Sequence, residues 1–272
     1  MDKTADLLTL VSGGEPFLDK GVCFGSPRPC HVFMMDLIRR LSGKPDIRVL
    51  EIGSWLGASL LTWDAALAKY NDGKGALTSV DPHNPYFTPP VEATPFERQF
   101  ARIMETGLAY DIFRHNTGCI KASGGFTHLR AGSKNALPQL RDGHFDVVYV
   151  DGDHRYSAAK FDLMEAQRLL ADGGYLCGDD LIIQAEDCDP EFLAETREQE
   201  SVRMPDTDIR FFPGVTAAVA EVLGPLPTRK GFWAVQKNGS KWDAVTFDDI
   251  EAEVPNHFPD DIRDAILKDL AE

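Results

Sequence analysis

The 272-residue sequence contains only five cysteines, and no two of them form a C-x-x-C pair. This small, odd number in that arrangement indicates neither a zinc site nor a disulfide framework. Basic residues are also few, because 28 Lys and Arg stand against 43 Asp and Glu, which gives a formal net charge of −15. Nucleic acids and anionic membranes are bound through clustered Lys and Arg, so we expect neither as a partner.

Long apolar runs are absent as well. No stretch approaches the ~18 apolar residues of a transmembrane helix, and the first twenty residues lack a basic start followed by an apolar core. We therefore expect a cytoplasmic protein. With 43% hydrophobic residues, a chain of this length can bury one large core, which predicts one domain that carries insertions.

The most informative stretch runs from Phe145 to Leu181. An apolar run at 147–150 breaks into Asp151-Gly152-Asp153-His154, and a second run at 175–177 breaks into Gly178-Asp179-Asp180. Apolar residues between the two runs recur at helical spacing, and Asp172-Gly173-Gly174 is typical of the turn that ends a helix. The stretch therefore predicts a strand, a helix and a second, parallel strand. Both strands then end at the same edge of the sheet, where open α/β sheets bind their ligands.

Three carboxylates, those of Asp151, Asp179 and Asp180, are expected to be neighbours at that edge. Carboxylates that are brought together repel one another unless they are protonated or share a cation. Oxygen ligands suit a hard ion such as Mg²⁺, Mn²⁺ or Ca²⁺, so the functional interpretation is a metal site. The alternative is that Asp is common after strands and at helix N-caps, with no ion involved.

A second candidate binding region follows an earlier predicted strand, 47–52. Gly53 lets the chain turn close to a ligand, Gly57 lets the next helix pack on the strand, and Ser59 can meet polar ligand atoms. The pattern E-x-G-x-x-x-G-x-S departs from G-x-G-x-x-G, which argues against a pyrophosphate and hence against NAD. Asp81 ends the next strand, where a carboxylate can accept hydrogen bonds from a ribose diol.

Two segments are longer than plain connections. Residues 82–120 begin with several prolines and continue as a helical stretch, which predicts a substrate lid. In this lid, His83, Tyr86 and Phe87 are candidates to line the pocket, with loop packing as the alternative role. Residues 184–210 are strongly acidic, which predicts an exposed insertion beside the ligand edge and favours a solvated surface without a role in the site.

Three motifs resemble those of known methyltransferases. The segment Leu50-Glu51-Ile52-Gly53-Ser54-Trp55-Leu56-Gly57-Ala58-Ser59 looks like the first-strand motif of class I S-adenosylmethionine-dependent O-methyltransferases of the catechol and caffeoyl-CoA type. Val150-Asp151-Gly152-Asp153-His154 and Gly178-Asp179-Asp180 look more like the macrocin O-methyltransferase relatives, which modify natural-product sugars. The resemblance implies a Rossmann-like, doubly wound α/β fold with a seven-stranded, mostly parallel sheet, six strands parallel and one antiparallel, and helices on both faces.

The resemblance also divides the chain. Residues 45–237 correspond to the methyltransferase domain, with insertions at about 82–120 and 184–210. Residues 1–44 are then an N-terminal helical cover segment, and residues 238–272 are a C-terminal tail. By the same resemblance a homodimer would be unsurprising.

The resemblance further implies roles by position. It assigns nine positions to the binding of S-adenosylmethionine: Glu51, Gly53, Ser54, Gly57, Ser59, Asp81, Gly132, Ser133 and Asp151. Of these, Gly132 and Ser133 are expected near the adenine. In such enzymes Mg²⁺ is held at the positions of Asp151, Asp179 and Asp180. Enzymes of the catechol type have Asn at the position that corresponds to Asp180. Asp180 gives this chain one more negative charge at the site than those enzymes have, which favours the macrocin-like branch.

The chemistry then needs a base. A methyl group on a sulfonium is already activated, so the enzyme must present a deprotonated oxygen in line with the S–CH₃ bond. A divalent ion lowers the pKa of a coordinated hydroxyl, and a nearby base removes its proton. Asp153 is favoured because macrocin-like relatives place their base there, and His154, which titrates near neutrality, is the other candidate.

The sequence thus predicts a Mg²⁺-dependent O-methyltransferase that acts on a hydroxyl of a small metabolite or natural product, with S-adenosylmethionine and Mg²⁺ or another hard divalent cation as cofactors. One alternative is a metal-independent small-molecule methyltransferase in which the acid clusters only bind substrate or cap helices. Another is a module that binds S-adenosylmethionine without catalysis.

Overall fold

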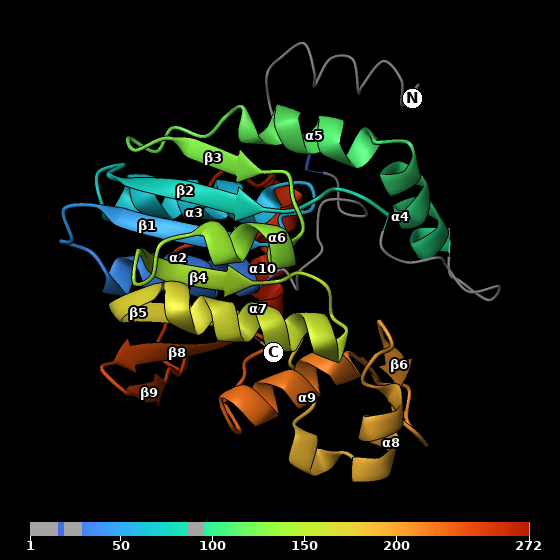
Figure 1. The fold of residues 1–272 in the computed structure, drawn as a ribbon. Coiled ribbons are helices and arrows are strands. Elements are labelled where there is room, and N and C mark those ends of the chain that lie inside the picture. The colour runs from blue at the N-terminus through green and yellow to red at the C-terminus, as the bar shows by residue number, and fades with distance from the viewer. Residues whose placement is uncertain (1–15, 19–28, 86–94, 272) are drawn as a thin grey trace.

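The computed structural model describes residues 16–18, 29–85 and 95–271. At its centre lies a seven-stranded sheet with the order β3-β2-β1-β4-β5-β8-β9 (Figure 1). Its strands are β1 (Ile47–Ile52), β2 (Gly75–Val80), β3 (Phe126–Leu129), β4 (Phe145–Val150), β5 (Leu170–Gly178), β8 (Trp233–Asn238) and β9 (Lys241–Ala244). Strands β1 to β5 are parallel, and β8 is antiparallel to both β5 and β9. The predicted doubly wound sheet, with six strands in one direction and one in the other, is confirmed.

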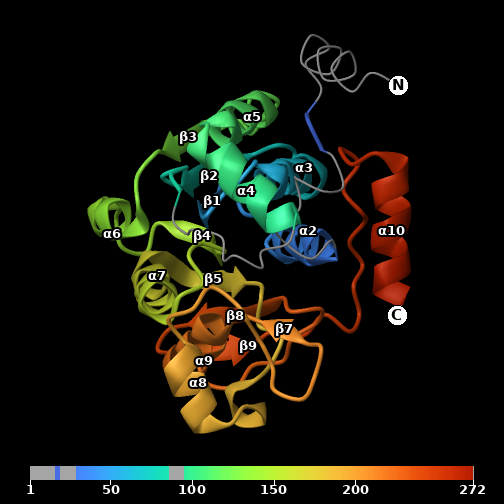
Figure 2. The ribbon, with the colours of Figure 1, turned by 90° about the vertical axis from the view of Figure 1, so that its right-hand side faces the viewer.

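Helices cover both faces of the sheet (Figures 1 and 2). The α-helices are α2 (Cys30–Arg40), α3 (Ala58–Tyr70), α4 (Pro95–Glu105), α5 (Leu108–Thr117), α6 (Ser133–Ala136), α7 (Tyr156–Leu169), α8 (Pro190–Thr196), α9 (Pro213–Val222) and α10 (Asp260–Ala271). Short 3₁₀ turns lie at Leu137–Gln139 and Ala185–Asp187. A separate two-stranded sheet consists of β6 (Val202–Arg203) and β7 (Arg210–Phe211). One core lies under α2, α3 and α5, and the other lies under α6, α7 and α9. Strands that are buried on both faces have nearly continuous apolar sequences, which is why β1 and β4 could be predicted from the sequence.

The junction between α7 and β5 differs from the prediction. The sequence Asp172-Gly173-Gly174 was expected to form the turn that ends the helix, but the helix ends at Leu169 and β5 begins at Leu170. Gly173 has a φ of +77°, and the register of β4 against β5 shifts between Phe145 and Val147. The glycines therefore form an irregularity inside the strand, since Leu170 already has extended backbone.

Residues 238–272, predicted as a tail, complete the fold. The hairpin turn between β8 and β9 contains Asn238-Gly239, and Gly239 has a φ of +62°, as a tight hairpin requires. Further on, α10 lies outside α2 (Figure 2) and buries Ile262 and Ile266 in a cluster that includes Val32 of α2. No helix in the part of the chain that the structure describes is both long and apolar enough to cross a membrane.

The predicted lid, residues 82–120, contains α4 and α5. His83 is only 2% exposed, and its ring packs against Tyr110 and Phe113, so it supports the loop and does not line a pocket. Tyr86 and Phe87 lie outside the described residues, as does most of the predicted cover segment before α2. Figure 1 shows α4 on one side and α8 with β6 on the other side of the edge at which the parallel strands end.

Candidate active site

A cavity of about 770 Å³ opens at the carboxyl ends of the parallel strands. Seven predicted site residues line it: Gly53, Asp81, Gly132, Ser133, Asp151, Asp153 and His154. Four predicted cofactor residues, Glu51, Ser54, Gly57 and Ser59, are not among the lining residues. The volume lies within the usual range for small-molecule sites, ~300–1,000 Å³.

The turn after β1 leaves no room for a side chain. Gly53 has a φ of +82°, and a Cβ added there would lie 2.0 Å from the carbonyl oxygen of Asp151. Glu51 is fully buried behind this turn, and its carboxylate accepts hydrogen bonds from Ser59 Oγ at 2.6 Å and from Trp63 Nε1 at 3.0 Å. Burial raises the pKa of Glu51, although these two donors oppose the rise. The four residues outside the cavity lining thus lie in or behind the turn, and their assignment to the cofactor stays a prediction.

Asp81 connects the turn to the end of β2. Its carboxylate accepts backbone hydrogen bonds from Ser54 at 2.9 Å, Trp55 at 3.0 Å and His83 at 2.7 Å. A carboxylate has about four acceptor positions, so three are used within the protein and about one remains for a ligand hydroxyl. Trp55 has a φ of +43° and stacks on Phe100 of α4 at 4.1 Å between ring centroids, which adds an aromatic wall to the cavity.

The acid cluster predicted at the ends of β4 and β5 is present, and His154 lies within it. Its Nε2 lies 3.0 Å from Oδ2 of Asp180 and 3.8 Å from Oδ1 of Asp151, and its Nδ1 lies 2.6 Å from Oε1 of Glu200. Burial alone would lower the pKa of His154, but its contacts with Asp151, Asp180 and Glu200 outweigh burial and raise that pKa. Atoms of Asp151, His154 and Asp180 are close enough together to share one metal ion.

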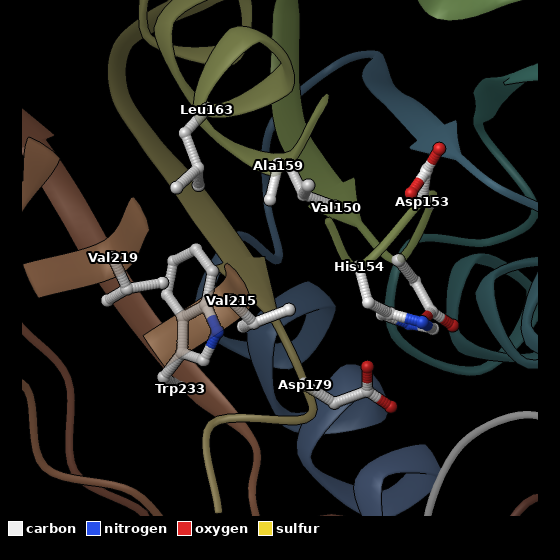
Figure 3. Close-up of a pocket in the computed structure, with 11 residues that line it drawn as sticks. Val150, Asp153, His154, Ala159, Leu163, Asp179, Val215, Val219 and Trp233 are labelled. Atoms are coloured by element: carbon white, nitrogen blue, oxygen red, sulfur yellow. The ribbon is translucent and has the colours of Figure 1, made fainter. Parts of the chain in front are cut away.

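Asp179 differs from the other acids of the cluster in its hydrogen bonding. The residue is 3% exposed, and neither carboxylate oxygen has a hydrogen-bond donor among the described residues. An apolar wall that includes Val215 and Trp233 lies beside it (Figure 3). Burial, followed by the charges of Asp151 and Asp180, raises its pKa well above the ordinary value.

Asp153 points away from this cluster. Figure 3 shows it on the opposite side of His154 from Asp179. Its carboxylate pairs with Arg155, whose Nε donates to Oδ1 at 2.8 Å and whose Nη2 donates to Oδ2. Burial would raise the pKa of Asp153, but the Arg155 hydrogen bonds outweigh burial and lower that pKa. A carboxylate with a lowered pKa is a weak proton acceptor, so the pairing with Arg155 argues against Asp153 as the base. The role of His154 as the base stays a prediction.

The acidic insertion reaches the site, so the expectation that 184–210 is only solvated surface is wrong. Glu198, Glu200, Ser201 and Arg210 line the cavity, and Glu200 contacts His154. No local pattern distinguishes Glu200 from the other acids of the insertion, so the sequence held no signal for it.

Asp162 is a second lining residue that sequence reasoning missed. It lies on the face of α7 that buries Ala159, Leu163 and Ala166, so an acid at an apolar helical position was a signal that could have found it.

Several known proteins are similar to this chain. A family model described as a methyltransferase domain matches residues 50–181, and no curated protein sequence matches the chain. The solved O-methyltransferase NovP is 15% identical, with a TM-score of 0.50 over 78% of this chain and 79% of that chain. An O-methyltransferase from Bacillus cereus in complex with SAH is 15% identical, with a TM-score of 0.42 over 90% of this chain and 89% of that one. TomG from Streptomyces achromogenes, an O-methyltransferase solved with SAM, is 16% identical, with a TM-score of 0.41 over 90% and 96%.

The sheet order, the cavity at the strand ends and the matched segment together define a class I methyltransferase domain. Residues 50–181 are thus a methyltransferase domain, which confirms the class of enzyme predicted from the motifs, an S-adenosylmethionine-dependent methyltransferase.

Proposed function

We propose that this methyltransferase transfers the methyl group of S-adenosylmethionine to a hydroxyl of a small molecule, with a divalent cation held by Asp151, Asp179 and Asp180. The observation that carries the proposal is Asp179, whose two buried oxygens have no hydrogen-bond donor among the described residues and lie beside two further carboxylates. A buried, unpaired carboxylate is costly, and a hard cation would both supply its missing partner and relieve the repulsion. When bound, Mg²⁺ would lower the pKa of the acceptor hydroxyl and fix its position.

His154 is proposed as the base. It would receive the acceptor proton at Nε2 as the acceptor oxygen forms its bond to the methyl carbon and the S–CH₃ bond breaks, releasing S-adenosylhomocysteine. Glu200 holds Nδ1 at 2.6 Å and would stabilise the imidazolium that results. The carboxylates that raise the pKa of His154 would be neutralised by a cation, which leaves the ring uncharged and able to accept a proton.

A second candidate is a metal-independent methyltransferase. His154 already lies between Asp151 and Asp180 at ion-pair distances, so its imidazolium alone is able to offset part of the negative charge of the cluster. In that case the cluster would bind or orient the acceptor without an ion.

Magnesium titration of the protein saturated with S-adenosylhomocysteine separates the two candidates. Calorimetry should give one Mg²⁺ site in the wild type and none in Asp179→Asn, while Asp179→Asn still binds the nucleoside. Asp208→Asn, which changes a fully exposed acid on the insertion, is the matched control and should keep the site.

Turnover is then measured as S-adenosylhomocysteine release with a panel of hydroxylated acceptors, with and without EDTA. Loss of turnover in EDTA and in Asp179→Asn supports the metal enzyme, whereas full turnover in both would overturn it in favour of the metal-independent one. A small hydroxylated acceptor, the absence of nucleic-acid and membrane partners, a homodimer and a cytoplasmic location stay predictions.

A further inference from the structure

His83 joins two parts of the cavity wall although it does not line the cavity itself. The residue is 2% exposed, and its ring packs against Tyr110 and Phe113 of α5. These contacts hold the imidazole in place between the turn after β1 and the end of β2. At these two places Trp55 and Asp81 line the cavity, so His83 lies directly behind both residues.

His83 contacts both of these residues through hydrogen-bonding groups. Its Nε2 lies 2.7 Å from the carbonyl oxygen of Trp55, and because a carbonyl only accepts, Nε2 carries a proton and donates it. The backbone N–H of His83 donates to Oδ1 of Asp81 at 2.7 Å. Its Nδ1 lies 3.4 Å from the same oxygen and has no hydrogen bond among the described residues. One residue thus ties the turn after β1 to the loop after β2.

The backbone at both ends of this link is strained. Trp55 has a φ of +43° and His83 has a φ of +49°, so two non-glycine residues in contact both occupy the left-handed region. Such residues cost free energy and persist only where their surroundings hold them. Asp81 accepts from the N–H of Trp55 at 3.0 Å, and His83 donates to the carbonyl of the same residue. Removal of the Nε2 donor therefore releases one of the two groups that hold Trp55.

We propose that His83 is a positioning residue, whose Nε2 bond to Trp55 holds the turn after β1 in the form in which Trp55 and Asp81 line the cavity. The inference rests on the proposed function only in that S-adenosylhomocysteine is the ligand used to test it. Loss of the bond lowers the fraction of protein molecules whose turn has this form, and the observed affinity for a ligand of the cavity falls in proportion. One hydrogen bond from a buried donor corresponds to a change of about 5- to 50-fold.

Three substitutions separate the two ring nitrogens from the packing of the ring. His83→Phe keeps an aromatic ring against Tyr110 and Phe113 but has no nitrogen. His83→Gln carries an amide nitrogen at the ε position, from which it can donate to Trp55, whereas His83→Asn carries one at the δ position, beside Asp81. Because Asn tolerates a φ of +49° well, backbone strain would not explain a loss of affinity in His83→Asn.

Affinity for S-adenosylhomocysteine is measured by calorimetry, and the melting temperature shows that each variant is folded. His83→Phe and His83→Asn should bind about 5- to 50-fold more weakly than the wild type, whereas His83→Gln should stay within about threefold of it. His144 precedes β4 and so lies at the opposite edge of the sheet. His144→Asn is therefore the matched control and should leave the affinity unchanged.

A second measurement needs no ligand. The fluorescence of Trp55 is obtained as the difference between spectra recorded with and without the additional substitution Trp55→Phe. It should change in His83→Asn, because the turn is released, and match the wild type in His83→Gln. A structural role of the ring alone would not give this rescue.

Wild-type affinity in His83→Phe would overturn the inference. An equal loss in His83→Gln and His83→Phe would overturn it as well, because packing of the ring would then explain both. Neither result touches the proposed function, which falls if the wild type does not bind S-adenosylhomocysteine. In that case the spectra decide the role of His83, and identical Trp55 spectra in the wild type and His83→Asn would rule it out.

Discussion

Removal of the Asp162 carboxyl should change the pH dependence of stability in a way that the structure defines. Burial raises the pKa of this group from 3.8 to about 7 in the folded protein. The folded state then binds the proton more tightly than the unfolded state, so the protonated carboxyl is tolerated and the ionised one is not. Its contribution to stability is complete below pH 3.8, declines as the pH rises, and is lost above pH 7.

The magnitude follows from the two pKa values. One pKa unit corresponds to about 1.4 kcal/mol, so full ionisation of Asp162 costs the folded state about 4 kcal/mol. Asp162→Asn keeps the size of the side chain and does not titrate. The free energy of unfolding of the variant minus that of the wild type should therefore rise by about 1.4 kcal/mol per pH unit between pH 4 and pH 7 and level off above pH 7.

The assay is urea unfolding followed by circular dichroism at pH 5, 6, 7 and 8 without ligand. The difference in free energy of unfolding between variant and wild type removes the contributions of the other buried acids to a first approximation, because those acids titrate in both proteins. Met164→Leu, at an exposed and uncharged position of the same helix, should give a flat difference. A flat difference for Asp162→Asn as well would mean that the carboxyl titrates normally, and the argument from burial would be refuted.

Three other changes test separate parts of the molecule. Gly53→Ala adds a Cβ that would lie 2.0 Å from backbone and should lower the free energy of unfolding by about 2–6 kcal/mol. Gly43 has a φ of +93° and open space around it, so Gly43→Ala should cost only the backbone strain of about 1 kcal/mol. Thermal unfolding of the two variants checks this, and equal losses of stability would contradict it. The ring nitrogens of His257 are buried and have no hydrogen-bond partner among the described residues. Burial lowers the pKa of His257 from 6.5 to about 3, so the stability that its neutral form provides above pH 6.5 is lost as the pH falls. His257→Phe should therefore spare about 3 kcal/mol of loss at pH 4.5, and melting curves as acid-sensitive as those of the wild type would refute this. Glu200→Gln should lower kcat by about 10- to 100-fold with little change in KM or melting temperature, because it removes the negative charge that holds the protonated His154; an unchanged kcat would remove Glu200 from the mechanism.

The sheet and the acid cluster were predictable for a physical reason. A parallel strand buried on both faces must be apolar along its length, and it must become polar where it leaves the core. The runs before Asp151 and Asp179 have this form, and the spacing of the helix between them makes the two strands parallel. Topology then brings the carboxylates to one edge without any information about the rest of the chain.

Residues whose positions depend on irregular segments were not predictable in this way. Glu200 reaches His154 because α8 and the β6–β7 hairpin fold back over the cavity, and nothing periodic in 184–210 reports that path. The edge strand β9 is a different case, since Asn238-Gly239 is a strong hairpin signal. The strand that follows it is short and mostly exposed, so its apolar pattern is weak and does not predict a strand.

Asp179 and Asp162 show that the burial of a carboxyl has different consequences in different surroundings. Both carboxyls are nearly inaccessible, and burial raises the pKa of both. Within the part of the chain that the structure describes, both oxygens of Asp179 and Oδ1 of Asp162 lack a hydrogen-bond partner. The neighbours of Asp179 are two further acids, so protonation or hydrogen bonding of one group leaves the others repelling, and only a positive charge resolves the cluster. Burial is the largest cause of the raised pKa of Asp162, and it is opposed by a hydrogen bond with Ser133 and by the charge of Lys134. One neutral donor is sufficient there, and a cation would have no second carboxylate to share. The same physical cost thus favours a cation at the end of β5 and a protonated carboxyl on α7.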